Sequence, residues 1–169
     1  VSLRCWSQRN REKIKYYYMI SRRPPDVKSN MTNQEIVSIL REMAIFLDME
    51  DVAFKPRAYE KAALGVESLG EGVGDIYQKG GLKALEDIPG VGKGIAEHIE
   101  ALLTKGSFAE YRQLKKKFPM RVSELVAVEG VGPKMVKTLW MKLHIKNLSD
   151  LERAARAGKI HSLPHFGEK

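Results

Sequence analysis

A glycine-rich turn that occurs twice, forty residues apart, constrains the fold of this chain more than any other feature. The first copy lies in EDIPGVGKGIAEHIE, residues 86–100, and the second in VEGVGPKMVKTLW, residues 128–140. In each copy one apolar residue separates two glycines, and a helical pattern of apolar residues follows. The sequence therefore predicts two units built alike, each a pair of short helices joined by a tight turn.

The residue types in these turns favour binding of an anion. The first glycine permits a backbone conformation closed to most residues, and the second lets the backbone approach another molecule closely. The next helix begins with free N–H groups and the positive end of its dipole, which suit a phosphate. The alternative, that the glycines serve only helix packing, stays open. The candidate phosphate contacts are Gly90, Gly92, Lys93 and Gly94 in the first copy and Gly130, Gly132 and Lys134 in the second.

The remaining pattern predicts an all-α fold, a small helical bundle followed by a second helical subdomain. No stretch shows the two-residue alternation of a strand, and Thr32 with Glu35 forms the signature of a helix start. A second such signature, Ser149 with Glu152, predicts the start of the last helix. We expect helices at 33–48, within 54–70 up to Gly70, around Gly80 and Gly81, and at 92–105, 107–119, 122–128, 132–144 and 149–158.

Charge is unevenly distributed along the chain. The net charge is +8, but residues 1–30 hold eight Lys and Arg against two Asp and Glu, which leaves only +2 for the rest. A nucleic-acid surface on the body must therefore come from local arrangement. Residues 1–30 are interpreted as a basic leader, flexible or added by cloning. No segment is apolar enough for a membrane, so we expect a cytoplasmic, nucleoid-associated monomer of a bacterium or archaeon.

The order of these motifs resembles the N-terminal part of family X DNA polymerases, especially the bacterial and archaeal kind. The resemblance rests on FKPRAYEKAA, both glycine turns, and LSDLERAARAGKIHSLPHFGEK, the last of which holds a partial third turn at 163–169. Each turn is similar to the helix-hairpin-helix motif, which binds DNA backbones without reading sequence. The resemblance implies a lyase-like four-helix domain at 31–106 and a second helix-hairpin-helix subdomain at 107–169, ending before the polymerase catalytic region.

The same resemblance implies which parts of a DNA gap the chain holds. The first domain would bind the 5′-phosphate side, with Lys55 and Tyr59 in the phosphate pocket, and the second hairpin would hold the primer strand. Backbone carbonyls would hold Na⁺ or K⁺ when DNA is bound, a role suited to oxygen ligands. No other cofactor is expected. The matching carbonyls are those of Glu86, Ile88 and Val91 in the first copy and Val126, Val128 and Val131 in the second.

One residue departs from the family's chemistry. Members with lyase activity remove 5′-deoxyribose phosphate through a lysine that forms a Schiff base, and His98 stands at that position. An imidazole cannot form this imine, which leaves Lys55 and Lys61 as candidate substitutes. Our main hypothesis is sequence-nonspecific binding of gapped or nicked, 5′-phosphorylated DNA in base excision repair. The alternatives are a lyase that uses a displaced lysine, and a scaffold for protein interactions.

Overall fold

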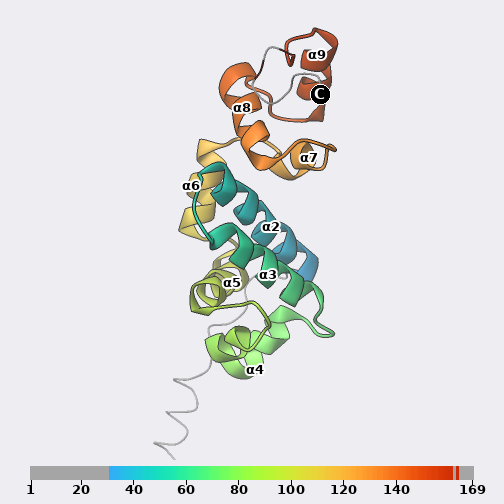
Figure 1. Ribbon diagram of the computed structural model, residues 1–169. Coiled ribbons are helices and arrows are strands. Elements are labelled where there is room, and N and C mark those ends of the chain that lie inside the picture. Colours follow the sequence, from blue (N-terminus) through green and yellow to red (C-terminus); the bar gives the residue numbers. More distant parts are fainter. Residues whose placement is uncertain (1–30, 162, 164–169) are drawn as a thin grey trace, which may run out of the picture.

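The structure, a computed structural model, describes residues 31–161 and Leu163. These residues form helices and turns without a strand, so the all-α prediction is confirmed (Figure 1). The predicted leader at 1–30 and most of the partial third turn lie outside the described residues. The helices are α2 (Asn33–Met49), α3 (Lys55–Glu67), α4 (Val73–Glu86), α5 (Lys93–Lys105), α6 (Ala109–Lys117), α7 (Val122–Val126), α8 (Pro133–Leu143) and α9 (Leu148–Arg156).

The helix ends follow local capping chemistry, with one correction. Thr32 caps α2 by accepting a hydrogen bond from the N–H of Glu35, whose side chain accepts one in return, as predicted. The predicted start of α9 at Ser149 is wrong. Asn147 caps this helix instead, since its side-chain oxygen accepts from the N–H of Asp150 at 2.9 Å. An amide at Asn147 caps as well as a hydroxyl does, so the cap lies two residues before Ser149 and the helix begins at Leu148.

Glycines shape two other helices. In α4, Gly81 has φ 63° and ψ −150°, which breaks the helix into two segments at the place where the sequence predicts a split. Gly106 ends α5 in the left-handed conformation, again as predicted. Helix α3 ends at Glu67, three residues before Gly70, the residue predicted to stop it.

Helices α2 to α5 enclose the first of two hydrophobic cores. In Figure 1 they form the lower body of the molecule, with α2 and α3 side by side. Val91, the apolar residue of the first glycine turn, is buried in this core, as is Phe108 just before α6. The turn is therefore anchored by its own middle residue. Within the described chain no helix is both long and apolar enough to cross a bilayer.

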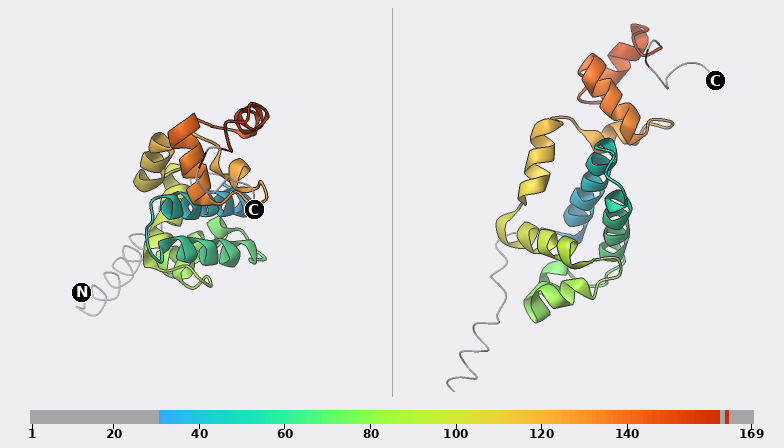
Figure 2. Two further views of the ribbon diagram at one scale, coloured as in Figure 1. Left: turned by 45° about the horizontal axis from the view of Figure 1, so that its top comes forward. Right: turned by 60° about the vertical axis from the view of Figure 1, so that its left-hand side comes forward.

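The second core lies among α7, α8 and the end of α2. Phe46 and Met49 of α2 are fully buried there together with Leu125 and Leu139. Figure 2 shows α7 to α9 at one end of α2, while α6 runs beside it. Helix α2 thus contributes side chains to both cores, and the division into domains at residues 106 and 107 stays a prediction.

Candidate nucleic-acid interface

The two glycine turns have the same backbone hydrogen bonds. In the first, the N–H of Val91 donates to the carbonyl of Ile88 at 3.0 Å; in the second, the N–H of Val131 donates to Val128 at the same distance. Each of these carbonyls keeps a second lone pair. The two turns therefore share this hydrogen bond, and the Ile88 and Val128 carbonyls, two of the six predicted to hold a cation, retain acceptor capacity.

The first glycine position of each turn requires glycine because of its backbone conformation. Gly90 has φ +83° and Gly130 has φ +80°, the left-handed region that L side chains rarely adopt. The two sites differ in their surroundings. A Cβ on Gly90 would lie 2.7 Å from the carbonyl oxygen of Lys61, whereas one on Gly130 would meet nothing within 4 Å. The first turn is thus packed against α3, and the second is open at this position.

The second glycines face outward. Gly92 and Gly132 occupy the N-cap positions of α5 and α8 with ordinary extended backbones, φ −87° and −91°, and no side-chain cap. A Cβ on either glycine, or on Gly94, would meet no protein atom within 4 Å. The first N–H groups of α5 therefore remain available to a ligand, with exposed Lys93 as its first residue. In α8 this first position is Pro133, which offers no N–H.

Lys134, the basic residue of the second turn, is held by the loop after α2. Its Nζ lies 2.8 Å from a carboxylate oxygen of Asp51, and the Nζ of Lys137 lies 3.6 Å from the other. Lys134 lowers the pKa of the Asp51 carboxyl by hydrogen bonding and by its charge. Both partners are largely exposed, so the pair contributes little stability and can exchange for another anion.

Three residues that the family resemblance places in the 5′-phosphate pocket or at the lyase position come together. The Tyr59 hydroxyl hydrogen-bonds His98 Nδ1 at 2.6 Å, and the His98 ring stacks on Phe108 with centroids 4.1 Å apart. Glu110, which sequence reasoning missed, lies 3.8 Å from Lys55 Nζ and 3.9 Å from His98 Nε2. The fourth candidate, Lys61, is on the exposed face of α3, with its backbone against Gly90.

The environment of His98 favours the neutral imidazole. Burial lowers its pKa, and nearby Lys55 lowers it further, while the charges of Glu110 and Glu97 act in the opposite direction. Burial also raises the pKa of Tyr59, so its hydroxyl stays protonated and can donate to Nδ1. The tautomer that this requires carries its proton on Nε2, toward Glu110.

We expect the stability of the protein to fall between pH 7 and pH 5 because of His98. Its folded pKa lies below the ordinary value of 6.5, so the unfolded state binds this proton more readily. The stabilisation that neutral His98 provides is complete above pH 6.5, and it is lost as the pH falls through the pKa of His98 in the folded protein. Urea unfolding at pH 5, 6 and 7 should show a shallower decline for His98→Gln than for the wild type. Identical profiles would contradict this account.

Another residue that sequence reasoning missed is Phe54, directly before α3. Its side chain is 88% exposed, and its backbone has φ 65° and ψ −35°, with the N–H of Lys55 donating to Ala53 at 2.8 Å. This is a strained three-residue turn that holds an aromatic ring in solvent. Such a ring offers the flat surface on which nucleic-acid bases stack. A large apolar side chain directly before a helix is the only sequence signal for it.

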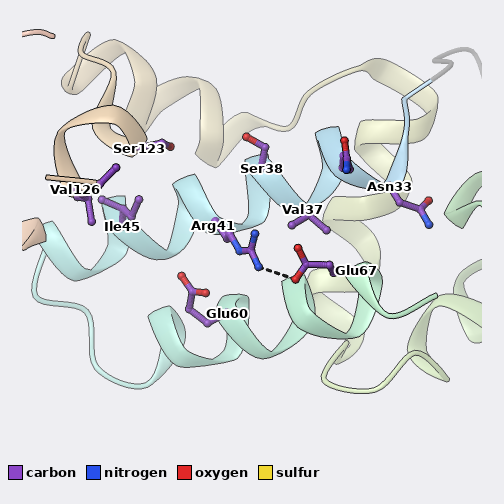
Figure 3. A pocket seen from close by; sticks show the side chains of 11 residues that line it. Asn33, Val37, Ser38, Arg41, Ile45, Glu60, Glu67, Ser123 and Val126 are labelled. Carbon is purple, nitrogen blue, oxygen red and sulfur yellow. Dashed lines mark hydrogen bonds and ion pairs between the residues drawn. The ribbon is translucent and has the colours of Figure 1, made fainter. Parts of the chain in front are cut away.

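A groove elsewhere shares only Val126 with the predicted site residues. It runs between α2, α3 and α7, where Arg41 pairs with Glu67 at 2.7 Å and Glu60 adds a second carboxylate (Figure 3). Two carboxylates against one guanidinium make this groove unsuited to phosphate. The candidate interface therefore consists of the two hairpin turns and the cluster of Lys55, Tyr59, His98 and Glu110.

Comparison with known proteins agrees with this geometry. Residues 31–108 match the helix-hairpin-helix domain, and residues 122–169 match the SAM-like helix-hairpin-helix tandem. Two separate parts of the chain therefore match helix-hairpin-helix families. These regions hold Gly90 and Gly130 respectively, so the repeat found in the sequence coincides with both matches.

Two curated relatives are DNA polymerases. The chain is 25% identical over 140 residues to DNA polymerase/3′-5′ exonuclease PolX of Bacillus subtilis (strain 168), covering 82% of this chain and 24% of the relative. It is 28% identical over 142 residues to DNA polymerase lambda of Arabidopsis thaliana, covering 80% of this chain and 25% of the relative. The resemblance of the helix-hairpin-helix regions to family X polymerases is confirmed, and the chain spans about a quarter of these relatives' length.

Proposed function

We propose that this chain binds the backbone of gapped, 5′-phosphorylated DNA without reading its sequence, in the cytoplasm of a bacterium or archaeon. The observation that carries the proposal is the pair of outward-facing turns, in which Gly92 and Gly132 leave open space before a helix start. An anion fits such a place because free N–H groups and the helix dipole meet there. Phosphate contacts of this kind position DNA but carry no base information.

Each hairpin would hold one side of the gap. The first turn lies in the same matched region, residues 31–108, as Lys55 and Tyr59, which would receive the 5′-phosphate, while the second turn would hold the primer strand. Carbonyl oxygens of the two turns, with those of Ile88 and Val128 keeping a free lone pair, would hold Na⁺ or K⁺ once DNA is bound. The relatives' names support a role in DNA synthesis or repair for the longer protein.

Salt dependence tests the proposal. Fluorescence anisotropy with a gapped duplex should give a log–log slope of about −0.9 for each phosphate neutralised, with equal affinities for unrelated sequences. An affinity that does not change between 50 and 200 mM salt would overturn it. Amide chemical shifts of both hairpins should move during the titration. Shifts confined to other surfaces would favour the protein-interaction scaffold instead.

The cluster around His98 supports binding rather than lyase chemistry. The imidazole cannot form a Schiff base, and the Lys55 amine faces the Glu110 carboxylate at 3.8 Å. Borohydride treatment with DNA that contains an incised abasic site should therefore leave no covalent adduct. An adduct that disappears in Lys55→Gln or Lys61→Gln would establish the lyase with that lysine as its amine.

A further inference from the structure

The carboxylate of Glu110 lies between the Lys55 ammonium and the His98 imidazole. One oxygen is 3.8 Å from Lys55 Nζ and the other is 3.9 Å from His98 Nε2, so it bridges a residue of α3 and a residue of α5. Glu110 itself comes from the first turn of α6. Three elements therefore meet at this one side chain, which is 36% exposed.

A carboxylate at this place competes with a phosphate. Both are anions with oxygen acceptors, and both are attracted by the Lys55 ammonium. The distances to Lys55 and His98 exceed those of direct hydrogen bonds, so the contact is a loose electrostatic one. An incoming phosphate would find Lys55 already facing a negative charge and would have to displace Glu110 from it.

Folding gives only a partial reason for an acid at this position. Negative charge in the first turn of α6 suits the helix dipole, but the dipole does not require the carboxylate to lie over Lys55 and His98. Glu97 is also an acid beside His98, and it is exposed without an ion pair to Lys55. The two carboxylates therefore differ in contact with the lysine, while both influence the histidine.

We propose that Glu110 is a specificity-determining residue that acts as an internal substitute for phosphate. Without DNA it lies beside the Lys55 ammonium, and it lowers the chain's preference for a 5′-phosphate over a 5′-hydroxyl. The proposal rests on the proposed function, since it concerns the same pocket. Helix α6 lies just beyond the first helix-hairpin-helix match. Through Glu110, this helix would help the chain to discriminate between a 5′-phosphate and a 5′-hydroxyl.

The test compares two gapped duplexes that differ only at the 5′ end. Glu110→Gln keeps the shape of the side chain and removes its charge, and Glu97→Gln is the matched control. For Glu110→Gln, affinity for the 5′-phosphorylated duplex should rise about five- to tenfold, while affinity for the 5′-hydroxyl duplex should change less than about twofold. Glu97→Gln should change the ratio of the two affinities by less than about twofold.

A double-mutant cycle identifies the cation involved. In a Lys55→Gln background the gain from Glu110→Gln should disappear, because the competing anions no longer share a lysine. Equal gains on both duplexes, or a gain that persists without Lys55, would overturn the inference. Should Glu110→Gln lower the melting temperature, Glu110→Asp, which shortens the reach to Lys55, should raise the same ratio. If the wild type fails to bind either duplex, the proposed function fails instead.

Discussion

Gly92→Asp combined with Gly132→Asp should stabilise the protein slightly and reduce its affinity for gapped DNA by orders of magnitude. Both glycines are N-caps whose backbones suit any residue, and a Cβ on either meets nothing within 4 Å. Aspartate is among the best N-cap residues, so each replacement should add a few tenths of a kcal/mol. Because stability should rise while affinity falls, a loss of affinity could not be explained by unfolding.

The loss of affinity follows from Coulomb repulsion. If a phosphate approaches the helix start, the new carboxylate would face it at about 5 Å, which costs roughly 3 kcal/mol at an effective dielectric constant of 20. One hairpin would then lose about 100-fold in affinity, since each 1.4 kcal/mol corresponds to a factor of ten. Anisotropy at fixed salt measures this loss, and urea unfolding measures the stability.

Gly92→Ser with Gly132→Ser provides the matched control. Serine caps a helix about as well as aspartate but carries no charge, so the stability gain should persist. The affinity should fall much less than with aspartate. A doubly aspartate-substituted protein that binds gapped DNA as tightly as the wild type would show that neither turn faces phosphate.

Gly65→Ala should destabilise the protein by about 3 kcal/mol, the upper part of the range for overpacking. A Cβ on Gly65 would lie 1.9 Å from the carbonyl oxygen of Pro89, a backbone atom that cannot turn aside. Helix α3 and the first hairpin would have to separate, and Val91 would lose its buried place. Urea unfolding should show a midpoint shift without a change in slope.

Gly94→Ala is the control for this prediction. It lies within α5, where a Cβ meets nothing within 4 Å, so alanine should stabilise the helix by up to about 1 kcal/mol. The same substitution thus has opposite effects at two helical glycines. A Gly65→Ala protein as stable as the wild type would mean that the hairpin does not pack against α3 as described.

Local patterns predicted most of the fold because the deciding interactions are short-range. The capping box at Thr32, the split in α4 at Gly81 and the stop at Gly106 each depend on residues within one turn of the helix. The start of α9 was predicted wrongly for a related reason. Asn147 and Ser149 are both good caps two residues apart, and the sequence alone does not decide between them.

The candidate site was harder to predict because its charges come from distant elements. Glu110 meets Lys55 and His98 only after α6 folds back beside α2, and Asp51 meets Lys134 only after α8 packs against the end of α2. Charge counting along the chain cannot find such pairs. By contrast, the unusual backbone conformation of Gly90 and Gly130 was predicted from the sequence, since it depends on the residue type and the local turn.

Because α2 contributes side chains to both cores, we expect the described helices to fold as one unit. Phe46 and Met49 have no accessible surface in the intact protein, and their partners come from α7, α8 and the segment between α6 and α7. A fragment that ends near residue 108 would present these two large side chains to water at one end of a helix. Such a patch favours self-association, so the first helix-hairpin-helix region expressed alone should aggregate unless this end is made polar.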